Sequence, residues 1–142
     1  MSAECFIDTN LFVYQLEALD EEKAATADRI ISRGIETRSG CISFQVVQEC
    51  LNTSLRKAEI PLSKEQVRTY LDTVLAPLWR VSPSLALYRR ALDVQARYRY
   101  SFYDSLIIAA ALDADCTRLY SEDLQDGHKI EALTIENPFK GT

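Results

Sequence analysis

Two kinds of apolar pattern alternate along the chain, one typical of strands and one typical of helices. Short apolar runs bounded by polar residues predict strands at 5–8, 41–42, 78–81, 118–120 and 133–135. Between them, apolar residues recur every three or four positions, which predicts helices at 20–33, 44–59, 63–75, 83–98 and 102–112. Strands that alternate with helices predict an α/β fold with a mostly parallel sheet of four to five strands, covered by helices on both faces.

Residues with known preferences for helix ends refine these boundaries. Ser43, Ser63 and Ser101 each precede a helical segment, where a serine side chain can cap the first free N–H groups of the helix. We expect Gly34 to close the helix that begins near residue 20. We expect Pro77 to lie just beyond the end of the helix that Ser63 starts.

The size and composition of the chain fit one domain spanning residues 1–142, because 142 residues with 47% hydrophobic content can bury a substantial core. The N-terminus lacks the basic and apolar regions of a secretory signal, and the longest apolar run, 106–112, is too short to cross a bilayer. We therefore expect a cytoplasmic protein that makes no membrane contact. The four cysteines have no C-x-x-C spacing, which favours reduced, buried thiols over zinc ligands or disulfides.

The composition excludes or weakens several classes of active site. A chain with one histidine cannot form a site that needs two, and there is no G-x-S-x-G elbow for a serine nucleophile. Among only four glycines there is no G-x-G-x-x-G or Walker A motif, which weakens nucleotide-cofactor functions. Carboxylates carry the remaining candidate chemistry.

Four acidic residues lie at the edges of apolar runs: Asp8, Glu49, Asp104 and Asp123. Asp8 and Asp123 follow predicted strands, and the other two lie in the first turns of predicted helices. In such sheets ligands bind at the carboxyl ends of the strands, so we expect all four acids at one edge. Carboxylates brought together repel one another unless a cation joins them. The pattern therefore predicts a divalent metal site with oxygen ligands, and hence phosphate chemistry.

Each acid also has a simpler explanation. Asp104 follows Ser101 at the spacing of a capping box, Glu49 could be a solvated residue on its helix, and Asp123 lies in a turn-like segment. Asp8 is the hardest to explain in this way, because Asp-Thr-Asn after a strand crowds three polar groups into a small space. The predicted metal site therefore rests on the ordered set of four.

The charge of the chain argues against a nucleic-acid binder, although its distribution softens this objection. The net charge is −5, whereas nucleic-acid binders are usually basic. The densest basic stretch could contact a phosphate backbone or pair with surface acids; it holds Arg89, Arg90, Arg97 and Arg99. Three tyrosines in the same region could stack on unpaired bases or pack in the core: Tyr98, Tyr100 and Tyr103.

Four motifs resemble, in order, those of PIN-domain ribonucleases, in particular the VapC-type toxins of toxin–antitoxin pairs. They are FIDTN at 6–10, ISFQVVQE at 42–49, SFYDSLIIA at 101–109 and LYSEDL at 119–124. In the last motif a hydroxyl residue, Ser121, stands two positions before the acid. Each motif is short, but the ordered set spans nearly the whole chain.

The resemblance implies a three-layer α/β/α sandwich and metal-dependent cleavage of RNA, with one or two Mg²⁺ or Mn²⁺ ions held by the four acids. Hydrolysis by water would leave 5′-phosphate and 3′-hydroxyl ends. The resemblance also implies a homodimer and inhibition by a small antitoxin protein. Because Glu122 and Asp126 flank Asp123, either could complete the metal site; we choose Asp123 by its match to the motif and keep Asp126 in reserve. The side chains expected to orient these ligands are Thr9, Asn10, Ser43 and Ser121.

Three other functions stay open. A catalytically silent PIN-like domain would bind RNA or a protein without cleavage. A haloacid-dehalogenase-like phosphatase needs a second Asp where Asn10 stands, and a receiver-like signalling domain needs a lysine that Lys129 is poorly placed to supply.

The expected homodimer needs an apolar surface, and the stretch 63–79 is a candidate. Its apolar side chains recur at helical spacing, which packing inside one subunit would explain equally well. They are Val67, Tyr70, Leu71, Val74 and Leu75.

Overall fold

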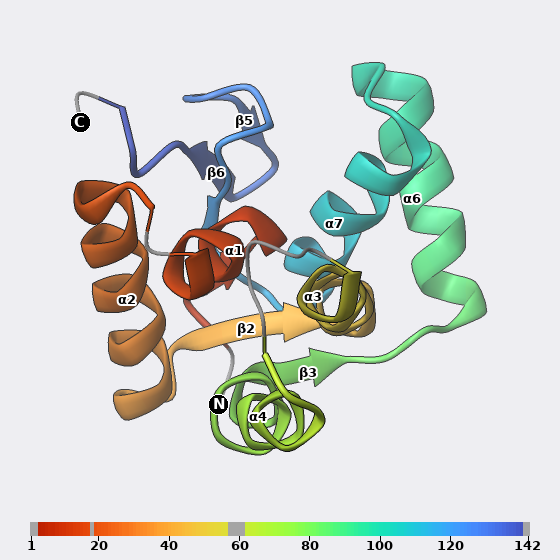
Figure 1. Ribbon diagram of the computed structural model, residues 1–142. Coiled ribbons are helices and arrows are strands. Elements are labelled where there is room, and N and C mark those ends of the chain that lie inside the picture. The colour runs from red at the N-terminus through yellow and green to blue at the C-terminus, as the bar shows by residue number, and fades with distance from the viewer. Residues whose placement is uncertain (1–2, 18, 57–61, 141–142) are drawn as a thin grey trace.

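A six-stranded sheet forms the centre of the computed structural model, which describes residues 3–17, 19–56 and 62–140, with 54–56 described by their backbone alone (Figure 1). The strands are β1 (Cys5–Ile7), β2 (Gly40–Ser43), β3 (Trp79–Val81), β4 (Arg118–Tyr120), β5 (Lys129–Ile130) and β6 (Leu133–Glu136). They lie in the order β3-β2-β1-β4-β6-β5, and every pair is parallel except β5–β6. The predicted mostly parallel sheet is confirmed, with six strands in place of four to five. The extra strand, β5, is too short to produce an apolar run.

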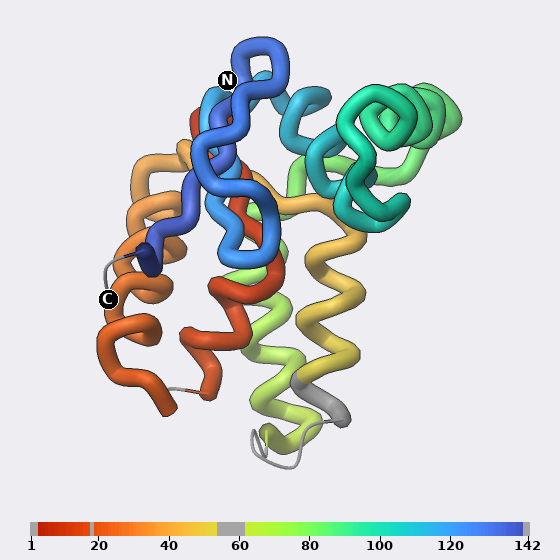
Figure 2. Tube along the Cα trace, turned by 90° about the horizontal axis from the view of Figure 1, so that it is seen from above, coloured from red at the N-terminus to blue at the C-terminus, as the bar shows by residue number. Residues whose placement is uncertain are grey.

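Helices cover the sheet on both faces, as predicted for a three-layer α/β/α sandwich. They are α1 (Thr9–Glu17), α2 (Glu21–Glu36), α3 (Phe44–Arg56), α4 (Lys64–Tyr70), the π-helical turn η1 (Leu71–Leu75), α5 (Ala76–Leu78), α6 (Leu85–Tyr98) and α7 (Phe102–Asp113). Figure 1 shows α2 and the α6–α7 pair on opposite sides of the molecule. Figure 2 shows α3 and α4 side by side, with α1 next to them. In the described part of the chain, no helix is long and apolar enough to cross a membrane.

The core explains why the chain is so rich in apolar runs. Residues 105–112 of α7 are all buried, so this helix shows no polar face. Three of the four cysteines are buried and all four are free thiols, as predicted. The core continues into the stretch 63–79, where Val67 and Leu75 are buried and the other apolar side chains pack against the core. Most of these apolar side chains therefore pack within one subunit, whereas Trp79 at the end of the stretch is 46% exposed; the stretch as a dimer surface stays a prediction.

Three expectations about helix ends are also corrected. Gly34 does not close α2, which continues to Glu36. A Cβ at Gly34 would lie 3.1 Å from the Cα of Gly40, so this position needs glycine for the close contact between α2 and β2. Ser43 is the last residue of β2, and its buried hydroxyl has no hydrogen-bond partner among the described residues, so it is no cap. Pro77 lies in the first turn of α5. Proline is tolerated there because the N–H groups of the first turn have no hydrogen-bond partner within the helix.

The helix starts at Ser63 and Ser101 agree with the sequence, whereas α6, expected from residue 83, begins at Leu85 with Ser84 as its cap. Ser63 caps α4 in a full capping box with Gln66, and Ser101 caps α7. The expected end of the second long helix, near residue 59, lies outside the described residues. These elements bring β1, β4 and the starts of α3 and α7 to one edge of the sheet, which is where the candidate site lies.

Candidate functional site

Asp8 is the most buried of the four acids and directly follows β1. Its backbone N–H donates to the carbonyl oxygen of Tyr120 at 3.0 Å, which extends the pairing between β1 and β4. The residue is 8% exposed. Its Oδ1 accepts from the Thr9 backbone N–H at 2.7 Å, and its Oδ2 accepts from Ser121 Oγ at 2.8 Å. Both carboxylate oxygens are therefore held in place by neighbouring motifs.

A chain of hydrogen bonds joins Asp8 to Asp123. Ser121 Oγ, which donates to Asp8, accepts from the backbone N–H of Asp123 at 3.2 Å. Asn10 Nδ2 donates to Asp123 Oδ2 at 3.2 Å, and Asn10 Oδ1 accepts from the Glu122 backbone N–H at 3.3 Å. These contacts tie the segment after β1 to the segment after β4 and orient two of the acids.

Glu49 and Asp104 come to the same edge from two helices. Glu49 lies in the second turn of α3, one turn later than expected, and Asp104 lies in the first turn of α7. Ser101 Oγ accepts from the Asp104 backbone N–H at 3.2 Å. No hydrogen bond of the Asp104 carboxylate is found among the described residues, so only half of the predicted capping box forms and this carboxylate is available to a ligand.

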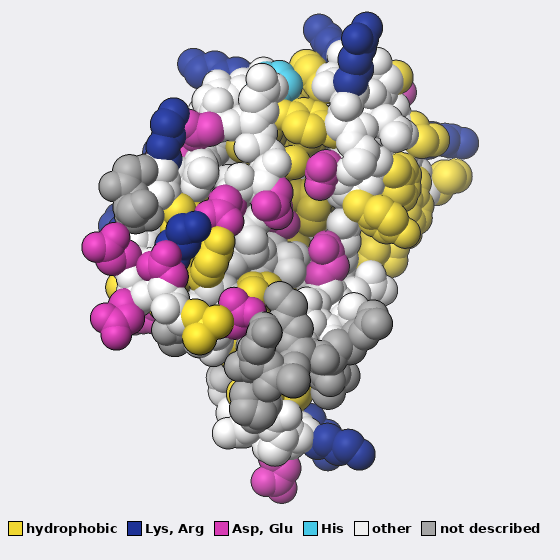
Figure 3. Space-filling view, turned by 45° about the horizontal axis from the view of Figure 1, so that its top comes forward, with side chains coloured by type: hydrophobic (Ala, Val, Ile, Leu, Met, Phe, Trp, Pro, Cys, Tyr) yellow, Lys and Arg dark blue, Asp and Glu magenta, His cyan; other side chains and the backbone are white. Residues whose placement is uncertain are grey.

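The carboxylates are close enough to affect one another's pKa values. Burial, with smaller contributions from the negative charges of Glu49 and Asp123, raises the pKa of Asp8 to about 7. The pKa of Glu49 is also raised, mainly because its carboxylate is partly buried, and the negative charges of Asp104 and Asp123 add to this rise. Acidic side chains gather in the middle of the face shown in Figure 3, beside an apolar patch. The four acids therefore share one neighbourhood, and none of them forms an ion pair with a lysine or arginine that the structure describes.

The two acids that flank Asp123 are engaged elsewhere. The carboxylate of Glu122 accepts hydrogen bonds from Lys23 Nζ at 2.8 Å and from Tyr14 Oη. The carboxylate of Asp126 accepts from a backbone N–H of the C-terminal segment at 2.8 Å and from Lys140 Nζ at 3.1 Å. Of the three candidates after β4, Asp123 is the one that lies against the network around Asp8.

Several buried polar atoms near the acids have no partner among the described residues. They are Thr9 Oγ1, Ser43 Oγ, Gln45 Oε1 and Ser105 Oγ. Thr9 directly follows Asp8 and Ser105 directly follows Asp104, while Ser43 and Gln45 lie on either side of the junction between β2 and α3. Buried polar groups are nearly always paired with protein or water, so these atoms indicate ordered water or a hydrated ligand beside the acids.

The donor set fits a hard divalent cation. It consists of carboxylate, hydroxyl and amide oxygens, which Mg²⁺ and Mn²⁺ prefer, and it contains no histidine or thiol. Within the described residues, no three acidic, histidine or cysteine side chains lie close enough together to hold an ion directly. A cation held here would therefore keep part of its water shell, as Mg²⁺ usually does.

The four arginines expected to bind RNA differ in their contacts. Arg90 makes ion pairs with Asp113 at 2.7 Å and with Glu131 at 3.4 Å, so it has a structural role. Arg89, Arg97 and Arg99 are exposed. Arg99 ends α6 in the left-handed conformation, with φ of 61°, and Arg97 lies over a tyrosine ring at 5.5 Å. The two arginines at the end of α6 are therefore the ones nearest the segment that leads to α7.

The three tyrosines of this region differ in exposure. Tyr100 Oη and His128 Nδ1 are hydrogen-bonded at 2.8 Å, and Tyr98 contacts the edge of the same histidine ring. Tyr103 is 69% exposed, and its ring touches Phe102 edge-on at 5.5 Å. Only Tyr103 thus offers a largely open ring beside an acid of the site.

Gln45 belongs to the site and was missed by the sequence analysis. It is 5% exposed, and its Nε2 donates to the carbonyl oxygen of Tyr103 at 3.2 Å, which links the start of α3 to the start of α7. A polar residue inside an apolar run was the available signal, since such a residue needs a buried partner.

Comparison with known proteins agrees with the motifs. The family model described as the PIN domain matches residues 5–126. Comparison with curated proteins found no match.

Several solved structures share the fold. A toxin–antitoxin complex from Klebsiella pneumoniae matches with a TM-score of 0.67 at 15% identity, over 96% of this chain and 98% of that one. VapBC2 from Rickettsia felis, bound to a DNA fragment from its promoter, matches with a TM-score of 0.66 at 19% identity, over 94% and 97%. VapC20 from Mycobacterium tuberculosis, described as a toxin that cleaves the sarcin–ricin loop, matches with a TM-score of 0.60 at 19% identity, over 84% and 92%. At such identities the likeness concerns the fold.

Proposed function

The chain belongs to the PIN-domain family, and from this premise we propose that it is a metal-dependent endoribonuclease, the toxin of a toxin–antitoxin pair. The observation that carries the proposal is the network around Asp8. A buried carboxylate with a pKa raised to about 7, held at both oxygens and surrounded by other acids, is costly for the fold unless a cation binds there.

We assign the metal site to Asp8, Glu49, Asp104 and Asp123. A bound Mg²⁺ or Mn²⁺ neutralises phosphate charge and makes a water molecule more acidic. Ser121 and the Thr9 N–H fix the Asp8 carboxylate, while Asn10 fixes that of Asp123. Ser43 Oγ, buried without a partner among the described residues, is available to an ordered water of the site.

The substrate contacts follow from the same edge of the sheet. Arg97 and Arg99 would contact the phosphate backbone, and Tyr103 would stack on an unpaired base. The chemical step adds water across the phosphodiester: the bond from phosphorus to the 3′ oxygen breaks, and that oxygen takes up a proton. The products are a 5′-phosphate and a 3′-hydroxyl.

The partners are proposed by similarity. The solved structures from Klebsiella pneumoniae and Rickettsia felis are a toxin–antitoxin complex and VapBC2, and we propose that this chain likewise binds a small antitoxin and forms a homodimer. We also propose that residues 1–142 form a single domain and that it acts in the cytoplasm.

The proposal is tested by incubating the purified chain, free of antitoxin, with total RNA. Cleavage is expected with Mn²⁺ or Mg²⁺, no cleavage is expected in EDTA, and mapped fragments should begin with a 5′-phosphate. Full cleavage in EDTA, or ends with a 2′,3′-cyclic phosphate, would contradict the mechanism. Metal and RNA binding with no cleavage would favour the catalytically silent alternative.

A further inference from the structure

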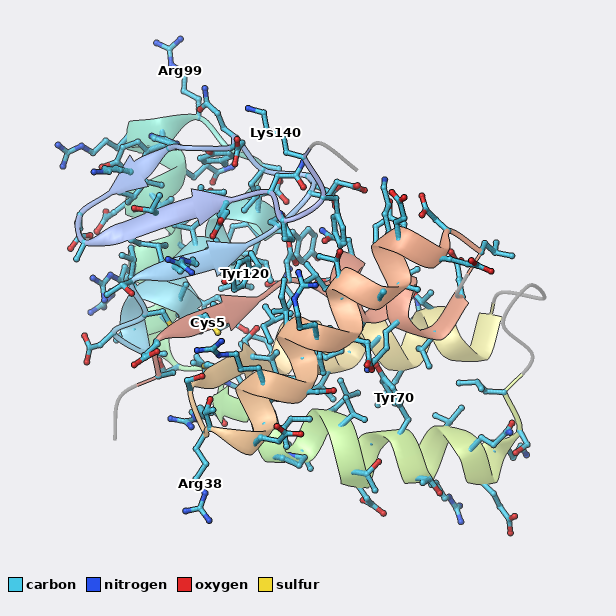
Figure 4. All side chains as sticks on the ribbon, turned by 90° about the vertical axis from the view of Figure 1, so that its left-hand side faces the viewer. Cys5, Arg38, Tyr70, Arg99, Tyr120 and Lys140 are labelled. Carbon is cyan, nitrogen blue, oxygen red and sulfur yellow. The ribbon has the colours of Figure 1, made fainter. Side chains whose placement is uncertain are left out.

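A polar cavity of about 460 Å³ lies between α2 and the strands β1, β4 and β6. Figure 4 shows Cys5 and Tyr120, two residues of its lining, between α2 and the strands. Cys5 precedes Asp8 by three residues, so the cavity begins about 10 Å along β1 from the acid site. Its volume falls in the range of small-molecule sites.

The sheet face under this cavity is unusual for a parallel sheet. Residues paired in register project to the same face, and alternate residues of a strand project to opposite faces. Cys5 pairs with Gly40 and with Arg118, and Tyr120 pairs with Glu136. The face that meets α2 is therefore small or apolar over β2 and β1 and polar or aromatic over β4 and β6. Because that half is not sealed by apolar packing, it is open to a ligand.

Three guanidinium groups line the cavity in a chain whose net charge is −5. Arg29 and Arg33, one helical turn apart on α2, are exposed, and neither has an acceptor among the described residues. Arg118 on β4 is fixed by Glu136 Oε2 at 3.2 Å and by Tyr120 Oη at 3.0 Å. Both Arg33 and Arg118 lie near enough to Cys5 to counter the rise in its thiol pKa that burial causes.

The rest of the lining suits an organic phosphate better than a bare anion. Ile30, Pro138 and the ring of Tyr120 supply an apolar wall, and Ser39 supplies a hydroxyl. Glu4 is an acceptor that would repel a free anion and could bind sugar hydroxyls. Cys5 is no nucleophile here, because burial raises its thiol pKa to about 11.

We propose that this cavity binds a nucleoside phosphate. Arg29 and Arg33 would hold the phosphate from α2, where the two side chains are free to form charge-assisted bonds. Tyr120 would face the nucleoside. The ligand could be a free mononucleotide or one nucleotide of an RNA strand, since both offer the same groups. The proposal does not depend on catalysis at the carboxylate site.

The test is titration calorimetry with the full-length chain in EDTA, so that the carboxylate site holds no cation. The probes are a mononucleotide mixture, a short single-stranded RNA and inorganic phosphate. We expect a dissociation constant below about 1 mM for at least one of the first two probes, and weaker binding of inorganic phosphate. The double variant Arg29→Gln/Arg33→Gln should weaken binding roughly 10-fold or more.

Arg68→Gln is the matched control, because Arg68 is also an exposed helical arginine but lies outside the cavity. It should leave the affinity unchanged, and melting temperatures should show that all variants are folded. A loss confined to the RNA probe would assign the cavity to the substrate strand, and a loss with mononucleotide would assign it to a free ligand. No binding, or equal affinities for the parent, the double variant and the control, would overturn the proposal, and equal binding of inorganic phosphate would overturn the nucleoside assignment.

Discussion

At the scale of single residues, Asp8 is the position where the stability of the fold and the proposed function make opposite demands. Two hydrogen bonds to its carboxylate favour the charged form, yet burial outweighs them and raises its pKa to about 7. The folded, metal-free protein therefore binds a proton at Asp8 that the unfolded chain, with an ordinary Asp pKa of 3.8, releases. A cation would relieve this cost.

The first prediction concerns the pH dependence of the metal-free fold. Because the folded state binds the extra proton, the stability that Asp8 contributes is fully present below pH 3.8 and is lost as the pH rises through about 7. In EDTA, the melting temperature should fall between pH 5 and pH 8, by at least about 3 °C. Mg²⁺ should reduce this fall. Differential scanning calorimetry across this range measures it.

Asp8→Asn is the control for this effect. The amide cannot ionise and keeps nearly the same shape, so the variant should melt above the parent in EDTA at pH 8 and close to it at pH 5. A variant that melts clearly below the parent at pH 8 would mean that Asp8 is needed for the fold as a charged group.

At the scale of elements, the sequence predicts what depends on local pattern. The strands, the caps at Ser63 and Ser101, and the buried α7 follow from spacing and propensity. Gly34 and Pro77 were misread because their roles depend on contacts that a local pattern does not contain: the approach of β2 to α2, and the π-helical turn before α5. β5 was missed because its two residues, Lys129 and Ile130, are too few to show the alternating apolar pattern of a strand.

In the candidate site, too, some features follow from local sequence and others depend on the fold. The four acids could be singled out in the sequence because each stands beside an apolar run that sets its position. The choice among Glu122, Asp123 and Asp126 depends on partners far away in sequence: Lys23 holds the first and Lys140 holds the last. No rule of spacing identifies these partners, so only the fold separates the three acids.

The second prediction concerns the end of α6. If Arg97 and Arg99 contact phosphates, replacing both should weaken RNA binding and flatten the salt dependence by roughly one to two units of slope. Arg97→Gln and Arg99→Asn suit the test, because asparagine tolerates the left-handed conformation at position 99. Binding is measured on the Asp8→Asn background, so that RNA stays intact.

The matched control is Arg68→Gln, an exposed helical arginine that lies on α4 and outside α6. Its affinity and slope should equal those of the parent. An unchanged slope in the double variant would assign Arg97 and Arg99 to the solvated surface.

At the scale of the whole molecule, α6 offers a second candidate surface, beside the stretch 63–79, for the proposed homodimer. Leu85, Tyr88 and Leu92 are 66%, 38% and 54% exposed and recur on one side of this helix. Arg89 and Asp93 flank them with opposite charges, and neither is paired with another described residue. In an antiparallel pair of α6 helices related by a twofold axis, each arginine can meet the aspartate of the other copy.

The third prediction is a dimer through this face. Light scattering at micromolar concentration should give twice the chain mass of 16.1 kDa. Leu92→Glu should give a monomer, because it places a charge in the apolar strip, whereas Leu19→Glu, at another exposed leucine, should not. A monomeric parent, or a dimer that survives Leu92→Glu, would contradict the assignment.

The central claim is that the four acids hold the cation that supports RNA hydrolysis. It is tested most directly by the single-turnover cleavage rate of one RNA fragment in saturating Mn²⁺. We expect Asp8→Asn to lower this rate by about 100-fold or more, and Asp126→Asn, which changes a neighbouring acid already paired with Lys140, to stay close to the parent. Equal rates for the parent and Asp8→Asn, or cleavage by the parent that persists in EDTA, would contradict the account.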